Sequence, residues 1–288
     1  MVTCDILIIG AGAAGIAAAK AAAEQGWQQI MLVDRKKEPG GILQQCFHRG
    51  FGRNVSGPEY VRELLLDFPE SVIWQPGTTV LSVGADKTAK LSSAQFGRQT
   101  VAFRQLILAT GCREVPLGAL PIGGTRPRGI YTAGQMQEMM NLHGFRPEGP
   151  VVILGSGDIG LVMAGHLADR EIPVTLVEQR ECCGGMIKNQ VCLGNPFVRL
   201  LCASTIREVH GKKQLEGVTL SGGEFLPCKT LLIAAGLRPD RELIRGLEDY
   251  DWVSSCGNCS TVHPIVESVV TEGEQAGIAA YEKIRGSL

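Results

Sequence analysis

The residues Asp5-Ile-Leu-Ile-Ile-Gly10-Ala-Gly12-Ala-Ala-Gly15 decide the fold of the first part of the chain. In this stretch a short apolar run ends in a GxGxxG turn, and the alanine-rich segment from Ile16 to Gln25 follows it. That order predicts a strand, a tight turn and a helix. A second apolar run, Gln29 to Val33, ends in Asp34, which lies 24 positions after Gly10. The segment therefore predicts a complete βαβ unit.

Such a unit has the parts required to bind a dinucleotide. The glycines allow the turn and let backbone N–H groups approach a pyrophosphate at the helix N-terminus, while a carboxylate at the second strand end accepts hydrogen bonds from a ribose diol. A GxGxxG turn alone is weak evidence, but here the strand, helix and acidic residue accompany it. The predicted site comprises Gly10, Gly12, Ala14, Gly15 and Asp34.

The same pattern returns in the second half of the chain, at Val151-Val-Ile-Leu-Gly155-Ser-Gly157-Asp-Ile-Gly160. A helical stretch follows, and the strand from Val174 to Val177 ends in Glu178, 23 positions after Gly155. Two complete patterns predict two dinucleotide sites, because each site uses one helix N-terminus and one acidic strand end. The alternative, that one pattern is a degenerate copy, is disfavoured because neither lacks a glycine or the acidic residue.

Two further apolar runs show how the chain divides. Leu106 to Gly111 and Leu231 to Gly236 are both runs of buried-strand type that stop at a glycine, one before and one after the second pattern. We interpret them as the points where the chain passes between two domains. The predicted fold is α/β, with two Rossmann-like, three-layer ββα domains and the second inserted in the first. Short β-type runs from Val72 to Phe103, beginning with Val72 to Trp74, predict a small meander in the first domain.

Composition restricts the partners and the compartment. The formal net charge of the 288 residues is -1 and no dense basic run occurs, so we expect small-molecule or protein partners and neither nucleic acid nor an anionic membrane. The ten cysteines are scattered through apolar segments, which favours a reducing cytoplasm. The stretch Ile6 to Ala23 contains glycines at turn spacing and no basic leader, so we interpret it as core and expect no membrane span. Cys256 and Cys259 have CxxC spacing but lack a second cysteine pair for a zinc site, so no metal is expected.

Together the motifs GAGAAG, ATG, GSGDIG, AAGLRPD and CGN, in this order and followed by a helical terminus, resemble the two-dinucleotide-binding-domain flavoproteins of the pyridine nucleotide-disulfide oxidoreductase superfamily, in the compact thioredoxin-reductase architecture. Gly40 to Gly52 and Gly57 to Tyr60 also resemble FAD- and NAD-binding partner subunits of anaerobic glycerol-3-phosphate-dehydrogenase-like proteins. Opine-oxidase and hydrogen-cyanide-synthase subunits are more distant relatives by the same resemblance.

The resemblance implies FAD in residues 1–113 and 237–288 and NAD(H) in residues 114–236. It implies that Asn258 stands where the superfamily usually has an aspartate that meets the ribityl chain, and that an amide there still accepts a hydroxyl hydrogen bond. Glu178 would repel the 2′-phosphate of NADP and so favour NAD(H), although Arg180 could turn toward a phosphate. Pro264 would lie in the first turn of a helix directed at the flavin. The full set of implied cofactor-binding residues adds Gly40, Gly41, Thr110, Gly111, Gly155, Gly157, Gly160, Gly236, Gly257 and His263.

Three features invite a catalytic interpretation. Cys46 and His48 follow the paired glycines where the chain is expected to pass the flavin; they are candidates for a redox thiol and a proton donor, each weighed against a buried structural role. Cys256-Gly-Asn-Cys259 has the CxxC spacing of a disulfide reductase, but its surroundings match a ribityl-binding loop.

These observations predict an FAD-dependent enzyme that transfers hydride between NAD(H) and FAD, as the electron-transfer subunit of a heteromeric dehydrogenase. One alternative is a self-sufficient NADH-dependent reductase of a disulfide, peroxide or quinone that uses Cys46. The other is a non-catalytic flavin-binding structural or redox-sensing subunit, whose bound FAD would not be reduced by NADH.

Overall fold

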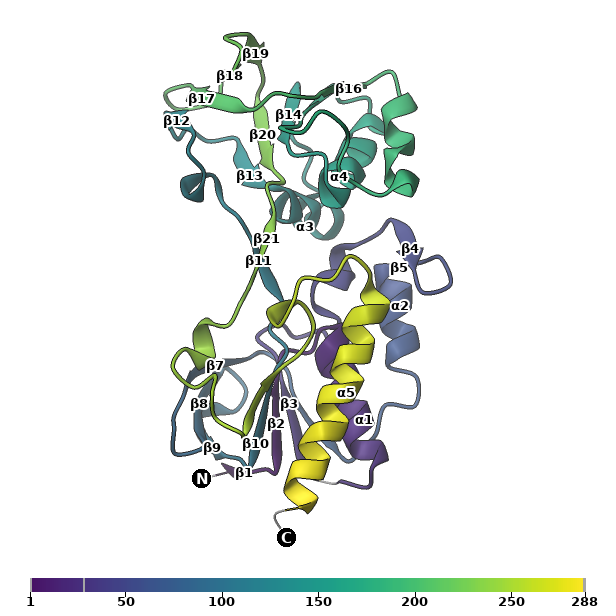
Figure 1. Ribbon diagram of the computed structural model, residues 1–288, viewed down its shortest axis with the longest axis vertical. Helices are drawn as coiled ribbons and strands as arrows, with labels where there is room; N and C mark the ends of the chain where they lie inside the picture. Colours follow the sequence, from purple (N-terminus) through teal and green to yellow (C-terminus); the bar gives the residue numbers. More distant parts are fainter. Residues whose placement is uncertain (1, 28, 287–288) are drawn as a thin grey trace. The chain divides into compact units, whose positions relative to one another are not determined.

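The chain leaves its first folding unit after Arg113 and returns to it at Arg238. Unit 1 consists of residues 1–113 and 238–288, and unit 2 of residues 114–237 (Figure 1). The computed structural model describes residues 2–27 and 29–286. The two crossing segments, β11 (Cys112–Glu114) and β21 (Leu237–Pro239), pair with each other as a two-stranded sheet.

A five-stranded parallel sheet in the order β22-β10-β2-β3-β6 forms the centre of unit 1. All residues of β2 and β3 are buried, as expected for parallel strands covered on both faces. Helix α1 (Ala13–Glu24) connects these two strands, which confirms the predicted βαβ unit. The strands are β2 (Ile6–Ile9), β3 (Ile30–Val33), β6 (Val72–Gln75), β10 (Gln105–Leu108) and β22 (Val253–Ser255).

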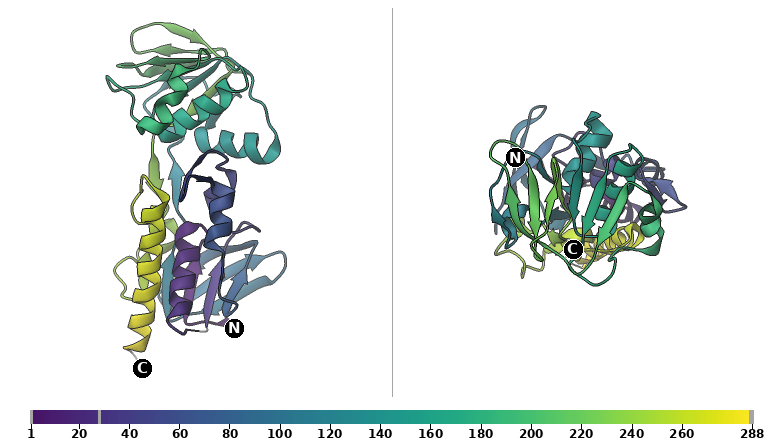
Figure 2. Two further views of the ribbon diagram at one scale, coloured as in Figure 1. Left: turned by 90° about the vertical axis from the view of Figure 1, so that its right-hand side faces the viewer. Right: turned by 90° about the horizontal axis from the view of Figure 1, so that it is seen from above.

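Alternate residues of β2 enter two separate cores, because successive side chains of a strand point to opposite faces. Ile6 and Ile8 pack with alanines of α1 and with Ala280 of α5 (Val266–Arg285). Leu7 and Ile9 pack instead against a four-stranded sheet formed, in this order, by β1 (Val2–Thr3), β9 (Gly97–Ala102), β8 (Thr88–Ser93) and β7 (Thr78–Val83). Unit 1 thus has three layers, a mainly antiparallel sheet, the parallel sheet and the pair of helices seen side by side in Figure 2, which confirms the predicted ββα fold.

The small meander begins one strand later than the sequence indicated. Val72 to Trp74 belongs to β6, which pairs in parallel with β3 at the edge of the central sheet, so its assignment to the meander was wrong. The meander consists of β7 (Thr78–Val83), β8 (Thr88–Ser93) and β9 (Gly97–Ala102), and β1 (Val2–Thr3) adds in parallel to β9. Strand β8 gives a weak sequence signal because only Ala89 and Leu91 in it are buried.

Unit 2 repeats this architecture. Its parallel sheet has the order β13-β20-β14-β15-β16, with α3 (Ala133–His143) and α4 (Asp158–Ala168) in the core on one face and the sheet β12-β17-β18-β19 on the other. The strands are β12 (Gly123–Gly124), β13 (Ile130–Thr132), β14 (Val151–Leu154), β15 (Val174–Val177), β16 (Val198–Leu201), β17 (Ile206–His210), β18 (Gly217–Leu220), β19 (Phe225–Pro227) and β20 (Thr230–Ile233).

Shorter elements join these layers. Within residues 2–27 and 29–286, no helix combines the length and apolar character needed to cross a membrane. The short elements are the strands β4 (Arg49–Phe51) and β5 (Val55–Ser56), helix α2 (Gly57–Leu64), and the 3-10 helices η1 (Gly41–Gln45), η2 (Leu117–Ala119), η3 (Ile187–Gly194), η4 (Glu242–Ile244) and η5 (Gly257–Cys259).

Two glycines let α5 lie directly against α1. A Cβ atom at Gly273 would lie 2.3 Å from the carbonyl oxygen of Ala14, and one at Gly277 would lie 2.2 Å from that of Ala18. The distance between packed helices depends on the side chains at their contact, and here the contact involves backbone. The packing of the last helix on the first therefore depends on glycine at these positions.

We expect Gly277→Val to lower the free energy of unfolding by about 1–3 kcal/mol, because backbone atoms of α1 cannot move aside as a flexible side chain would. The matched control is Ala279→Val on the exposed face of the same helix, which should cost less than about 1 kcal/mol. Thermal and urea unfolding followed by circular dichroism measure both. Equal effects of the two substitutions would contradict the packing argument.

Candidate functional site

The first glycine turn is held by contacts that exclude any side chain at two of its three glycines. A Cβ at Gly10 would lie 2.4 Å from the Ala109 carbonyl oxygen, and one at Gly15 would lie 1.8 Å from the Gly10 carbonyl oxygen. Gly10 also has a φ of 107°, and its N–H donates to the Val33 carbonyl oxygen at 2.8 Å. Only glycine fits at both places, because a positive φ and a backbone contact each disfavour a Cβ.

Gly12 differs from these two, because a Cβ there would have no protein atom within 4 Å. It is the N-cap of α1, where no side chain caps the helix and no acidic residue stands in the first turn. The first N–H groups of a helix have no partner within the helix, and its positive end favours an anion. Gly41 passes close by, with its ideal Cβ position 3.3 Å from the Gly12 Cα. The space beside Gly12 therefore fits the pyrophosphate of a dinucleotide, approached by bare backbone from two segments.

Asp34 is fixed at the end of β3 by two backbone donors. Its Oδ2 accepts the Ala11 N–H at 2.7 Å, and its Oδ1 accepts the Lys36 N–H at 2.7 Å. Each carboxylate oxygen has two acceptor positions, so one position on each oxygen is left for further donors. The carboxylate is thus oriented beside the glycine turn in the manner expected of a ribose-binding residue.

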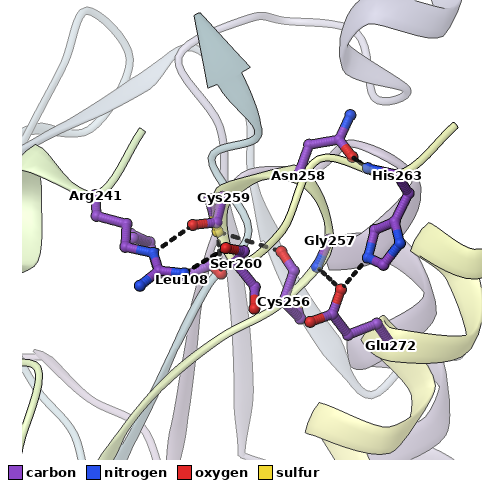
Figure 3. A network of polar contacts seen from close by, with 9 residues as sticks. All are labelled: Leu108, Arg241, Cys256, Gly257, Asn258, Cys259, Ser260, His263 and Glu272. Atoms are coloured by element: carbon purple, nitrogen blue, oxygen red, sulfur yellow. Dashed lines mark hydrogen bonds and ion pairs between the residues drawn. The ribbon is translucent and has the colours of Figure 1, made fainter. Parts of the chain in front are cut away.

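The C-terminal part of unit 1 brings a second loop to α1. A Cβ at Gly257 would lie 2.7 Å from the Ala14 Cβ, so the turn of η5 rests on the first turn of α1. Asn258 Oδ1 accepts the backbone N–H of His263 at 3.0 Å, and His263 Nε2 lies 2.5 Å from Glu272 Oε2 (Figure 3). The loop is therefore adjacent to the site at Gly12.

Pro264 does not lie where the sequence indicated. Ile265, with an extended backbone, is the N-cap of α5, and the helix begins at Val266. Pro264 thus precedes the cap and is outside the first turn, and no side chain caps this helix either.

The second glycine turn has the same construction as the first. A Cβ at Gly155 would lie 2.4 Å from the Ala234 carbonyl oxygen, and one at Gly160 would lie 2.3 Å from the Gly155 carbonyl oxygen. Gly157, the N-cap of α4, again has open space at its Cβ position and no side-chain cap. The two turns agree in which glycines are enclosed and in which one is open, so unit 2 has the same capacity to receive a pyrophosphate.

Glu178 is more enclosed than Asp34. Its Oε2 accepts the Ser156 N–H at 2.9 Å and the Ser156 hydroxyl at 2.6 Å, and its Oε1 accepts the Arg180 N–H at 3.0 Å and the Arg180 Nε–H at 3.1 Å. Burial raises the pKa of this carboxyl, but the hydrogen bonds from Arg180 and Ser156 outweigh burial and bring the pKa to about 2. Glu178 is therefore negatively charged at neutral pH, and the Arg180 guanidinium lies against it.

A loop after β15 packs near the same helix end. The Gly184 N–H donates to the Ser156 hydroxyl at 2.9 Å, and Asp158 Oδ1 accepts the Met186 N–H at 2.8 Å and the Asn189 side-chain N–H at 2.7 Å. Unlike α1, α4 has an acidic residue, Asp158, in its first turn. The carboxylate of Asp158 accepts hydrogen bonds from this loop.

The crossing residues lie at the ends of central strands. The Thr110 hydroxyl donates to the Asp240 carbonyl oxygen at 2.7 Å, and the Gly111 carbonyl oxygen accepts the Asp240 N–H at 3.0 Å. The Gly236 carbonyl oxygen accepts the Val115 N–H at 3.0 Å within unit 2. In the structure these residues tie the outgoing and returning segments of the chain together.

Cys46 and His48 follow η1. The Gly40 N–H, just before η1, donates to the Ala11 carbonyl oxygen at 2.6 Å, which draws this segment to the glycine turn. Cys46 is buried, its Sγ donates to the Ile42 carbonyl oxygen at 3.3 Å, and burial raises its pKa to about 12. His48 is half-buried, with its ring 5.1 Å from that of Phe51. A thiol with such a pKa is protonated at neutral pH and is a poor nucleophile.

The CxxC pair is also buried. Cys256 and Cys259 are both 0% exposed, and burial raises the pKa of each thiol. Cys259 Sγ donates to the Leu108 carbonyl oxygen at 2.9 Å and to the Cys256 carbonyl oxygen at 3.2 Å (Figure 3). These contacts favour a packing role. Among the residues described, no group of His, Cys, Asp and Glu side chains could hold a metal ion.

Sequence reasoning missed two contributors to these sites, Glu272 and Ser156. Glu272 contacts Gly257 and His263 from a helix, and Ser156 binds Glu178 from the turn 22 positions earlier. Neither pairing follows from a spacing rule. The one available signal was the position of Glu272 beside Gly273, on a helix face otherwise rich in small residues.

Comparison with known proteins agrees with this geometry. A family model described as pyridine nucleotide-disulphide oxidoreductase matches residues 4–251. An opine oxidase subunit of Agrobacterium tumefaciens (strain Ach5) is 29% identical over 272 residues, which is 83% of this chain and 53% of the relative. The chain thus spans about half the length of the opine oxidase subunits it matches first. Thioredoxin reductase of Mycolicibacterium smegmatis is 28% identical over 286 residues, 94% of this chain and 88% of that protein.

Solved structures agree on the fold. The crystal structure of T. acidophilum thioredoxin reductase superimposes with a TM-score of 0.79 at 19% identity, covering 99% of this chain and 100% of that one. The superposition confirms the expected two-domain fold, and the family match confirms the expected superfamily and its cofactors, FAD and a nicotinamide dinucleotide. The chain belongs to the pyridine nucleotide-disulphide oxidoreductase family.

Proposed function

We propose that the chain transfers hydride between NAD(H) and FAD and passes the electrons to or from a partner dehydrogenase subunit. The observation that carries the proposal is the pair of glycine turns, in which Gly12 and Gly157 each leave open space at an uncapped helix N-terminus. Each turn also has its own ionisable carboxylate at a strand end, Asp34 or Glu178. Two such turns in one chain fit two dinucleotides.

On the flavin side, the residues of unit 1 bind and orient. The backbone at Gly12 and Gly41 receives the pyrophosphate, Asp34 accepts from the adenosine ribose, and the Gly257-Asn258 turn meets the ribityl end. Bound FAD would supply the hydride acceptor, so no protein group has to form a covalent bond to the substrate. The residues of the site then contribute orientation and electrostatics.

On the nicotinamide side, Gly157 receives the second pyrophosphate and Glu178 governs the choice between NAD(H) and NADP(H). The charge of Glu178 opposes a 2′-phosphate, whereas the Arg180 guanidinium, 3.1 Å from that carboxylate, offsets part of the opposition. The balance favours NAD(H), because the carboxylate is buried while the side chain of Arg180 is 61% exposed and screened by solvent.

The thiols support electron transfer to a partner over direct disulfide reduction. Cys46, Cys256 and Cys259 are buried with raised pKa values, so none of the three has the activated thiolate that a disulfide reductase requires. The opine oxidase relative, by its name, is one component of an enzyme with several subunits. A role within a larger enzyme is consistent with both observations, and a reducing cytoplasm is the compartment we propose for it.

The two glycines at the helix ends give a matched test. Gly12→Val fills the space where the pyrophosphate of FAD approaches, and the purified protein should lose at least about tenfold in flavin affinity. Gly157→Val should keep its flavin but lose rapid reduction by NADH. Neither side chain meets protein atoms within 4 Å of its Cβ, so both variants should fold. Full flavin occupancy in Gly12→Val, measured by absorbance of the released cofactor, would refute the assignment.

Cofactor choice depends on Glu178 and Arg180 in opposite directions. Wild-type flavin should be reduced faster by NADH than by NADPH in anaerobic stopped-flow measurements. Glu178→Ala should lower the ratio of the NADH rate to the NADPH rate, because the negative charge that repels the 2′-phosphate is lost. Arg180→Ala should raise this ratio, because the positive charge that attracts the 2′-phosphate is lost. Since the pKa of Glu178 is about 2, Glu178 stays ionised, so the ratio of NADH to NADPH reduction rates should not change between about pH 7.5 and 8.5, where the 2′-phosphate is also fully ionised. Faster reduction by NADPH in the wild type would disprove this role.

Cys46→Ser separates a partner-dependent protein from a self-sufficient reductase. Serine can donate the same hydrogen bond to the Ile42 carbonyl oxygen, so flavin reduction by NADH should be retained in either case. In a partner-dependent protein, electron transfer to the proteins that co-purify under native conditions should also change by less than about twofold. Retained flavin reduction with abolished turnover of a disulfide or peroxide would instead establish the Cys46 reductase. Bound flavin that wild-type protein cannot reduce with NADH would indicate a non-catalytic role.

A further inference from the structure

The turn at Gly257 and Asn258 is held from both sides by side chains of unit 1. On one side Arg241 Nε donates to the Cys259 carbonyl oxygen at 2.6 Å, and Arg241 Nη2 donates to that of Ser260. On the other side the Gly257 N–H donates to Glu272 Oε2 at 3.0 Å (Figure 3). A loop with such contacts on both sides keeps its conformation before any ligand binds.

Glu272 reaches this turn from the second turn of α5. The same Oε2 atom that accepts the Gly257 N–H lies 2.5 Å from His263 Nε2, and the side chain of Glu272 is only 27% exposed. A carboxylate oxygen accepts hydrogen bonds, so the tautomer of His263 that donates from Nε2 matches this contact. Glu272 therefore fixes both the backbone of the turn and the ring of His263.

His263 in turn fixes Asn258. The backbone N–H of His263 donates to Asn258 Oδ1 at 3.0 Å, and only the oxygen of an amide can accept that bond. The orientation of the amide is thus determined, with its nitrogen directed away from His263 (Figure 3). Asn258 presents N–H donors where an aspartate would present only acceptors.

We propose that Glu272 is a positioning residue for FAD, which acts through Gly257 and His263 to hold the Asn258 amide so that it donates a hydrogen bond to an oxygen of the cofactor. The inference rests on the proposed placement of FAD at α1, and the contact of Gly257 with Ala14 brings the turn to that helix end. Two kinds of oxygen share this acceptor chemistry, those of the pyrophosphate and those of the ribityl hydroxyls.

Variants of Glu272 test the positioning role through the dissociation constant of FAD from apo-protein, measured by quenching of flavin fluorescence. Glu272→Ala should weaken binding at least about tenfold, as expected for loss of hydrogen bonds to a charged group. Glu272→Gln retains an acceptor oxygen and should rescue binding to within about threefold. Glu274→Ala, an exposed carboxylate on the same helix, is the matched control and should bind FAD like the wild type.

A double-mutant cycle shows whether Glu272 acts through Asn258. If it does, Glu272→Ala should weaken FAD binding by no more than about twofold further in a protein that already carries Asn258→Ala, because the two effects are coupled. Additive losses would show that Glu272 does not act through Asn258 and would overturn the proposal. Melting temperatures of the apo-proteins identify any variant that fails to fold. If Glu272→Ala does not fold, the comparison of Glu272→Gln with the wild type still tests the role of the acceptor oxygen.

The donor role of Asn258 has its own test. Where the amide donates to a pyrophosphate oxygen, which can only accept, Asn258→Asp should bind FAD more weakly than the wild type; a ribityl hydroxyl could instead donate to the new carboxylate. Tight FAD binding by Asn258→Asp, combined with ADP binding that is sensitive to Asn258→Ala, would overturn the donor role. Displacement of FAD by ADP distinguishes the two kinds of oxygen: a pyrophosphate contact makes ADP binding sensitive to Asn258→Ala, and a ribityl contact does not. Failure of wild-type apo-protein to bind FAD would contradict the proposed site itself.

Discussion

The approach of bare backbone to the N-terminus of a helix is the constraint on which the rest of the structure depends. At Gly10 and Gly15 a Cβ would meet carbonyl oxygens at 2.4 and 1.8 Å, so strand, turn and helix are in contact through backbone alone. The first N–H groups of α1 have no side-chain cap, and the space at Gly12 beside them is open. The glycines Gly273 and Gly277 extend the same principle, since they let α5 lie on α1 and bring its loop to the helix end.

The two units differ in how the carboxylate beside the glycine turn is hydrogen-bonded. Asp34 has acceptor positions left for a ribose, whereas each oxygen of Glu178 already accepts two hydrogen bonds. A nucleotide that hydrogen-bonds to Glu178 must therefore replace a donor, and the Arg180 side chain, 61% exposed, is the donor that moves most easily. Asp158 also accepts hydrogen bonds from the loop at Met186. These differences are consistent with a tightly held cofactor in unit 1 and an exchanging one in unit 2.

Much of this could be predicted from sequence because the glycine turns are local. The segment from Gly10 to Asp34 follows a strand directly and contains the turn, the helix and the next strand in continuous sequence. The segment from Gly155 to Glu178 does the same, so both βαβ units could be recognised. The long-range pairing of strands could not be predicted in this way. Val72 joins the central sheet by pairing with β3, which lies about forty positions earlier in the chain. Glu272 was missed because its contacts arise from folding the last helix back on its own loop. The cofactor roles of individual residues stay predictions.

The central claim is that each unit holds one dinucleotide at its own helix N-terminus. A crystal structure of the protein grown with FAD and NAD⁺ tests it most directly. The account predicts the FAD pyrophosphate beside Gly12 at α1 and the NAD⁺ pyrophosphate beside Gly157 at α4. Density for either pyrophosphate away from these two helix ends, or for both dinucleotides in one unit, would contradict it.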